Sequence, residues 1–249
     1  MRSPIYVGSR TPRRLPKEAA FPVYALHFDD LNDYIAIPDS PSLYFWAGDF
    51  SIRFWMTMEA SVNAGPSFMG QGDGVNDRFL FTYEKLNVRF DFAVKDAGVW
   101  TIDWHPAWAP LPGVWYYIVL TRKGNDWAFY VNGRLHASTN IVVALPNFAG
   151  DLMIGSRWDT TSNWGGKQNE LSILTRALSP YEVMDSLLRG YSRAEAATVL
   201  NLRMEEGSGD FVYDSSGNGN HGHLGNGVIA NMPSWVKVPK YQMLVEAGV

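Results

Sequence analysis

The chain has 249 residues, of which 46% are hydrophobic and 18% are charged. This balance supplies enough apolar side chains for a full core and excludes a disordered chain. The net charge of −4 argues against a general nucleic-acid binder, and the absence of cysteine excludes disulfides and thiolate metal sites. Ten tryptophans exceed what packing alone usually requires, which indicates stacking or a large contact surface.

The N-terminal segment is basic and rich in proline. Prolines at positions 4, 12, 16 and 22 exclude a regular helix. We predict an extended arm over residues 1–20 that binds an acidic partner, such as another copy of the chain, through Arg2, Arg10, Arg13 and Arg14. A solvated terminus is the alternative. The segment lacks the apolar core of a signal peptide, and no stretch approaches the roughly 18 apolar residues that span a bilayer, so we expect no membrane insertion.

Apolar and polar residues alternate with a period of two through most of the chain. In FSIRFWM, residues 50–56, the even positions are apolar and predict one buried face of a strand. VRFDFAV at 88–94 repeats the pattern with Arg89 and Asp91 on the outer face. Asn132-Gly133 in YVNGRLHA is a strong hairpin signal. Short strands separated by turn residues indicate a single all-β domain, either a sandwich or a barrel.

One helix is predicted in LSPYEVMDSLLRG, residues 178–190. Ser179 is the expected N-cap, Pro180 takes the first helical position and Glu182 completes a capping box. A strand resumes in VLNLRM, and residues 241–249 are expected to form a C-terminal tail.

Several segments together resemble laminin-G-like, concanavalin A-like lectin modules. ALHFDDLNDYIAIPDSPSLYFWAGDFSIRFWM is similar to the strands that open such modules, and WYYIVLTRKGNDWAFYVNGRLHAS is similar to their W-x-x-V-x-x-T strand and Y-V-N-G hairpin. DLMIGS, NELSILTRALSPYEV and MEEGSGDFVYDSSGNGNHGHLGNG resemble three further segments. The resemblance spans residues 24–236 and implies an antiparallel jelly-roll β-sandwich over 21–240 with one short C-terminal helix. It leaves function open, because this fold hosts lectins, adhesion modules, glycosidases and scaffold parts.

The sequence departs from the family pattern in two ways. Asp30 stands where the family usually has glycine, and the EGSG…DSSGNGN segment comes last, whereas it commonly precedes the ALxFDG segment. A truncated second module would leave VLNLRM without partners. We therefore predict that the C-terminal strands close the sandwich in circularly permuted order.

The segment YDSSGNGNHGHLGNG, residues 213–227, partly matches a calcium loop. Asp214, Ser216, Asn218 and Gly219 fit the first half of an EF-hand pattern, but Gly225 stands where the bidentate glutamate belongs. We interpret the segment as a turn in which Asp and Asn side chains bind backbone groups. His221 and His223 would share a strand face but lack an identifiable third metal ligand.

The resemblance also implies a calcium site at the rim of the sandwich, because many relatives bind calcium there. It points to FDDLND, where Asp29, Asn32 and Asp33 cluster between strands; these residue types are equally common in β-turns. Calcium is the one cofactor that we consider.

The loop RWDTTSNWGG is the candidate glycan site. Trp158, Asp159, Asn163 and Trp164 combine aromatic rings with polar groups, as sugar-binding sites do; packing of the rings under loops is the alternative. A second group, Trp100, Trp104 and Trp108, is interrupted by prolines and is expected to lie in a loop or irregular hairpin.

Catalysis is not expected, and no catalytic residue is assigned. The acids on predicted strands, Asp91, Asp103 and Glu170, look isolated, and glycosidases need two neighbouring carboxylates. Our first hypothesis is therefore a non-enzymatic interaction module in a larger, oligomeric assembly, such as a decoration or fibre protein on the surface of a virus or phage. The alternatives are a free carbohydrate-binding lectin, found outside cells, and, less favoured, a glycoside hydrolase.

Overall fold

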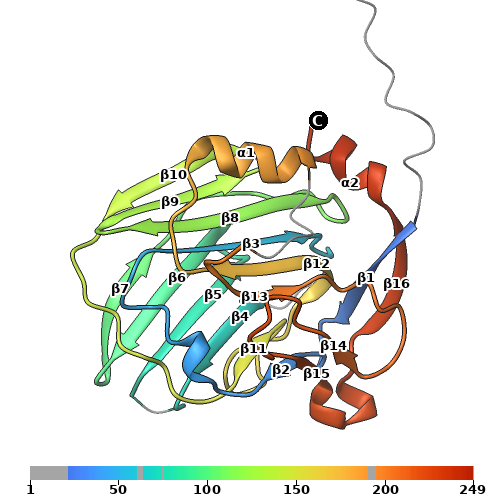
Figure 1. The fold of residues 1–249 in the computed structure, drawn as a ribbon, viewed down its shortest axis with the longest axis horizontal. Coiled ribbons are helices and arrows are strands. Elements are labelled where there is room, and N and C mark those ends of the chain that lie inside the picture. Colours follow the sequence, from blue (N-terminus) through green and yellow to red (C-terminus); the bar gives the residue numbers. More distant parts are fainter. Residues whose placement is uncertain (1–21, 61–63, 75, 190–194, 249) are drawn as a thin grey trace, which may run out of the picture.

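The computed structural model describes residues 22–60, 64–74, 76–189 and 195–248. These residues form two antiparallel β-sheets that stack into a sandwich (Figure 1). The all-β fold class expected from the alternating sequence is confirmed.

The first sheet, called sheet A, has eight described strands. In spatial order they are β10 (Arg134–Asn140), β9 (Asp126–Val131), β8 (Tyr116–Lys123), β3 (Phe50–Met56), β12 (Gly165–Leu174), β1 (Pro22–Asp29) and β16 (Ser234–Pro239), with β13 (Thr198–Leu202) also paired to β12.

The second sheet, called sheet B, also has eight described strands. In spatial order they are β14 (Phe211–Val212), β15 (Gly222–Leu224), β2 (Ile35–Ile37), β11 (Leu152–Ile154), β4 (Ser67–Gly72), β5 (Arg78–Glu84), β6 (Arg89–Asp96) and β7 (Val99–Trp104). Trp100 and Trp104 lie on β7, which pairs with β6 in a hairpin whose register shifts between Val94 and Lys95, so the irregular-hairpin alternative expected at these rings fits the structure.

The main core lies between the two sheets. On β3, Phe50, Ile52 and Phe54 are fully buried in it, as the alternation predicts. The opposite side of β3 is buried as well, because Trp55 packs in a second apolar cluster beneath the helices. Alternation thus identified the core face correctly, but it could not show that both faces of this strand are covered.

In the described part of the chain, two α-helices lie beside sheet A: α1 (Pro180–Arg189) and α2 (Lys240–Glu246) (Figure 1). The predicted capping box is present, since Glu182 N donates to Ser179 Oγ at 3.3 Å and Ser179 N donates to Glu182 Oε2 at 2.8 Å. The C-terminal residues expected to be a tail instead form α2, which buries Met243 in the cluster under the helices. Three short 3-10 turns complete the described elements: Pro41–Leu43, Gly225–Gly227 and Ile229–Asn231.

The C-terminal strands pair with the N-terminal ones. β16 runs antiparallel to β1, and β15 pairs with β2 in the other sheet. β13, which contains most of VLNLRM, pairs with β12. Closure of the sandwich by its last strands is therefore confirmed; that this order arose by circular permutation stays a prediction.

The hairpin between β9 and β10 is the tight turn that Asn132-Gly133 predicts. Both residues have positive φ, 50° and 75°, and Val131 pairs directly with Arg134. A Cβ on Gly133 would lie 2.8 Å from the Met184 side chain, so glycine also lets the turn approach α1.

Candidate functional site

The outer face of sheet B carries charged and aromatic side chains in rows across neighbouring strands. On β5, Phe79 and Phe81 are buried in the core, so Arg78 projects from the opposite face. Arg78 pairs with Lys95 on β6, and Lys95 pairs with Trp100 on β7. The register therefore places two cations and an indole ring in one row.

Two tryptophans and two arginines stack alternately on this face. The Arg78 guanidinium carbon lies 5.2 Å from the ring centroid of Trp100 and 4.5 Å from that of Trp158. The Arg157 guanidinium lies 4.4 Å from the Trp158 ring. We call Trp100, Arg78, Trp158 and Arg157 the Trp–Arg ladder. Its outer ring, Trp100, is 49% exposed, so the ladder presents an accessible aromatic surface.

The ladder concentrates positive charge at a partly buried place. The pKa of Arg78 is lowered, first because burial disfavours its charged form and then because Arg157 is close; Asp159 and Asp73 act in the opposite sense. The Nε atoms of both arginines are buried without a hydrogen-bond partner among the described residues. Stacking on indole rings accommodates such guanidinium groups, since ring faces attract cations.

A glycine on β4 allows the ladder to form. The loop that carries Arg157 and Trp158 crosses the outer side of β4 at Gly70, where an added Cβ would lie 3.2 Å from Trp158 N and 3.3 Å from Arg157 Cα. Hydrogen bonds between Arg157 and residues 160 and 161 fix the loop's conformation.

Further along the same face, three strands bring acids around a histidine. His105 Nε2 lies 3.3 Å from Asp91 Oδ1 and 3.0 Å from Asp103 Oδ1. Glu84 also contributes, because one ligand atom each from Glu84, Asp91 and His105 lies within 4.8 Å of the others. We call Glu84, Asp91, Asp103 and His105 the acid–histidine cluster. The interpretation of Asp91 and Asp103 as isolated acids is therefore wrong.

The electrostatics of Asp91 reflect this crowding. Burial raises its pKa to about 6, and the charges of Glu84 and Asp103 act in the same direction, whereas His105 lowers it. Sequence analysis missed this cluster because its members come from β5, β6 and the end of β7, and the strand register is not visible in the sequence. The alternation that placed Asp91 on an outer face was the one available signal.

The predicted glycan residues divide into a pair at the surface, of which Trp158 is only partly exposed, and a buried pair. Trp158 and Asp159 lie at the surface, with Trp158 in the ladder and Asp159 Oδ1 accepting a hydrogen bond from Thr161 Oγ1 at 2.6 Å. Trp164 is 0% exposed, packs against the Phe68 ring in the core and donates through Nε1 to Thr57 O.

Asn163 is buried too and donates to Asp33 O at 3.2 Å. A sugar cannot reach the Trp164 ring in this structure, so the assignment of Trp164 and Asn163 to a glycan site is corrected: both hold the loop in place. For these two residues, the alternative of rings packed under loops fits the structure.

The predicted calcium residues form a turn at the rim. Asp29 Oδ1 accepts hydrogen bonds from the backbone N–H groups of Leu31 and Asn32, and the Asn32 side chain donates to Asn231 Oδ1 at 3.0 Å. Asp33 Oδ2 accepts from Asp29 N, and burial together with the nearby Asp29 charge raises the Asp33 pKa to about 6. The arrangement is that of a β-turn, and a calcium ion there stays a prediction.

The 213–227 segment acts as the predicted turn. Both carboxylate oxygens of Asp214 are occupied by protein donors, among them the backbone N–H groups of Asn201 and Asn220. His223 stacks on Phe211 with ring centroids 4.3 Å apart, and His221 Nδ1 accepts from Asp214 N. These polar residues organise backbone rather than surround a ligand.

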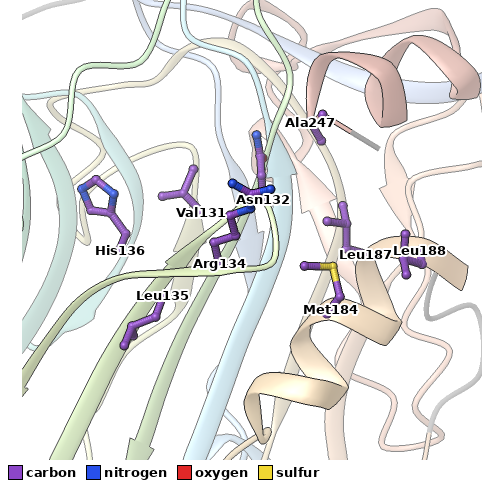
Figure 2. Close-up of a pocket in the computed structure, with 10 residues that line it drawn as sticks. Val131, Asn132, Arg134, Leu135, His136, Met184, Leu187, Leu188 and Ala247 are labelled. Carbon is purple, nitrogen blue, oxygen red and sulfur yellow. The ribbon is translucent and has the colours of Figure 1, made fainter.

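A cavity lies elsewhere, between β10 and α1. It has a volume of about 590 Å³ and is lined by residues of β10, α1 and the chain after α2, including His136, Met184 and Leu187 (Figure 2). Another, of about 360 Å³, lies at the N-terminal end of α1. Neither contains a member of the ladder or of the acid–histidine cluster. The predicted arm, with Arg2, Arg10, Arg13 and Arg14, lies outside the described residues.

Two antiparallel sheets stacked face to face, with charged side chains on the outer face of one of them, are typical of lectin-type β-sandwiches. The family model of the concanavalin A-like lectin/glucanases superfamily (Laminin_G_3) matches residues 29–184, which is more than half of the chain. The chain belongs to this superfamily. No curated protein matches the chain in sequence. No described helix is long and apolar enough to cross a membrane.

Solved structures with the same fold include several carbohydrate-binding proteins. A putative carbohydrate binding protein from Bacteroides ovatus aligns with a TM-score of 0.65 at 15% identity over 88% of this chain; this chain spans 60% of that protein's length. Domain 4 of AbnA, an arabinanase from Geobacillus stearothermophilus, in complex with arabinotriose, gives 0.53 at 17% identity over 65% of this chain and 75% of that chain. The CBM40 domain of the Ruminococcus gnavus IT-sialidase gives 0.52 at 14% identity, over 65% and 95%. At these identities the similarity establishes the fold.

Proposed function

We propose that the chain is a non-catalytic carbohydrate-binding module whose glycan lies on the outer face of sheet B against Trp100. Membership of a lectin/glucanase superfamily and the carbohydrate-binding names of structural neighbours support the ligand class. The observation that carries the proposal is an indole ring, 49% exposed, beside the Arg78 guanidinium on an open sheet face.

The ladder offers the two kinds of contact that sugars need. The C–H faces of a pyranose stack on an indole ring, and planar guanidinium groups donate hydrogen bonds to hydroxyl or carboxylate oxygens. Because Arg78 is stacked between Trp100 and Trp158, its position is fixed before the ligand arrives, which reduces the entropy lost on binding.

A glycan array followed by calorimetry on the best binder tests the proposal. Trp100→Ala removes the stacking ring and is expected to weaken binding by at least about tenfold, the loss of roughly 1.4 kcal/mol. Tyr181→Ala is the matched control, because Tyr181 is 74% exposed on α1, away from sheet B. Unchanged affinity in Trp100→Ala, or equal losses in both variants, would refute the site.

The assembly role inferred from the basic arm stays a separate proposal, as do the oligomer and the location on a virion or outside cells. It is compatible with glycan binding, since surface components of particles can carry binding modules. Deletion of residues 1–20 tests it: light scattering should show loss of the oligomer while glycan affinity is retained. An oligomer that survives the deletion would contradict a role for the arm.

A further inference from the structure

The acid–histidine cluster has the composition of a metal site rather than of a simple ion pair. It combines one imidazole with three carboxylates: Glu84, Asp91 and Asp103 around His105. Among the described residues, the guanidinium of Arg89 contacts this group, and its Nε donates to Glu84 Oε2 at 2.7 Å. Even with His105 protonated, these described groups sum to −1, so the cluster holds uncompensated negative charge.

Asp91 supplies a second and independent observation. The residue is 9% exposed, and its Oδ1 has no hydrogen-bond partner among the described residues. The contact from Oδ1 to His105 Nε2, at 3.3 Å, lacks the geometry of a hydrogen bond. Burying an ionised oxygen without a donor is costly, and a coordinated cation would remove that cost.

The protein already orients two of the carboxylates from outside the cluster. Thr82 Oγ1 donates to Asp91 Oδ2 at 3.4 Å, which leaves Oδ1 turned toward His105. Arg89 and Asn87 both donate to Oε2 of Glu84, so neither of them uses Oε1. Such outer hydrogen bonds commonly fix the ligands of a metal ion.

The distances fit coordination. In a tetrahedral site with bonds of about 2.0 Å, neighbouring ligand atoms lie about 3.3 Å apart. The two contacts of His105 Nε2, at 3.3 Å to Asp91 and 3.0 Å to Asp103, are close to that length. Small side-chain movements would then bring the ligand atoms around one ion.

From this geometry we propose that Glu84, Asp91, Asp103 and His105 bind one divalent transition-metal ion, Zn²⁺ or Mn²⁺, on the outer face of sheet B. One imidazole nitrogen among carboxylate oxygens favours these ions over Ca²⁺, which prefers oxygen ligands alone. The site is distinct from the rim turn at Asp29 and Asp33, and it does not depend on glycan binding.

Calorimetry on the full chain, free of affinity tag and treated with chelator, tests the site with ZnCl₂ and MnCl₂. One ion per chain is expected. Outer-shell changes at metal sites commonly cost 10- to 100-fold in affinity, so loss of a ligand in His105→Gln should cost at least about tenfold. Asp103→Asn should also weaken binding, and it is a safe substitution because this side chain is 67% exposed. His136→Gln, at an exposed histidine on β10, is the matched control.

Circular dichroism and the melting temperature of the metal-free variants show whether each variant is folded. If His105→Gln does not fold, Asp103→Asn still tests the site. Two results would overturn the site: no saturable binding of either ion up to about 1 mM, the weak end of natural sites, or affinities unchanged by both cluster substitutions. Calcium binding that is lost in Asp33→Asn, with no Zn²⁺ or Mn²⁺ bound, would place the cation at the rim and would equally overturn it.

Discussion

The outer faces of the two sheets differ in coverage: helices pack over that of sheet A, and that of sheet B is open. On sheet A, Trp55, Tyr117 and Tyr130 pack against α1 and α2, and Tyr117 shares a 2.8 Å hydrogen bond with Ser186. Burial is so complete that it raises the Tyr117 pKa. On sheet B, the corresponding surface carries the Trp–Arg ladder and the acid–histidine cluster, and no described helix packs over them. The aromatic residues on the outer face of sheet A are buried, whereas Trp100 on the outer face of sheet B is half-exposed.

The order of helices and strands along the chain explains why only sheet A is covered. Sheet A is followed in sequence by amphipathic segments, α1 after β12 and α2 after β16, whose apolar sides need a partner. The strands of the open part of sheet B, β4 to β7, are joined by short connections whose described residues form no helix. Charged side chains that stay exposed on this open face, such as Asp103, remain hydrated and cost little stability, whereas Arg78 and Asp91 are partly buried.

A large effect is expected when the helical cover of sheet A is disrupted. Leu187 on α1 is 1% exposed, so Leu187→Ala should destabilise the fold by about 3 kcal/mol through lost contacts and a cavity. Denaturant unfolding followed by fluorescence measures this change. Leu188→Ala, at a half-exposed neighbour, is the control and should cost much less; equal losses would mean that α1 does not bury its predicted face.

The next prediction concerns the pH dependence of stability caused by Asp33, at the rim of the sandwich. Since the folded-state pKa of Asp33, about 6, exceeds the ordinary 3.8, the folded protein loses stability as the pH rises through 6. Asp33→Asn removes this penalty and can still accept the hydrogen bond from Asp29 N. The variant should be more stable by on the order of 2 kcal/mol at pH 7.5, with no gain at pH 4.

Melting temperatures of the two proteins across that pH range check the difference. A gain that persists at pH 4 would contradict the electrostatic cause. If the predicted rim calcium binds, the gain should reverse at millimolar calcium, because the variant lacks a charged ligand.

A smaller effect on stability is expected from the N-cap of α1. Ser179→Ala removes the N-cap acceptor for Glu182 N and should cost about 1 kcal/mol. Ser179→Asp, which restores an acceptor, should recover most of that loss. Chemical denaturation of the three proteins compares them, and equal stability would show that packing alone fixes the helix.

The smallest expected effect on stability sharpens the contrast between faces. Trp100→Ala on sheet B should change the free energy of unfolding by less than about 1 kcal/mol, because half of the ring is exposed. Trp164→Ala, at a fully buried ring, should cost about 3–5 kcal/mol. A large loss of stability in Trp100→Ala would show that the ladder stabilises the loop at Arg157 and Trp158 and is not a ligand surface.

Local patterns predicted the parts of the fold that local chemistry determines. Alternation located β3, Asn132-Gly133 located a hairpin, and Ser179 with Glu182 located the start of α1. The order of the family segments also predicted that the last strands pair with the first. The C-terminal helix α2 was missed because seven residues give a weak periodic signal, and its docking through Met243 depends on sheet A.

The candidate site depended on what sequence reading lacks, namely the register between distant strands. Trp158 lies partly exposed in the ladder, and its role in glycan binding stays a prediction. Trp164, six residues later, has the same composition around it but turns into the core. Arg78 and Trp100 come into contact because of the register in which β5, β6 and β7 pair. The sequence around either residue does not predict this contact. The same holds for Glu84 and His105.

The pairing of β1 with β16 also has a mechanical consequence. Pro22 lies opposite Pro239, so the outer ends of both strands leave the sheet at the same edge. Tension applied through these two points would pull the strands apart one hydrogen bond at a time, because the ladder bonds lie along the direction of force. If the two strands were instead pulled from opposite ends, the force would act on all of their hydrogen bonds at once. Under such traction the module is expected to open first at this seam, while β3, β8 and β12 keep the sheet intact.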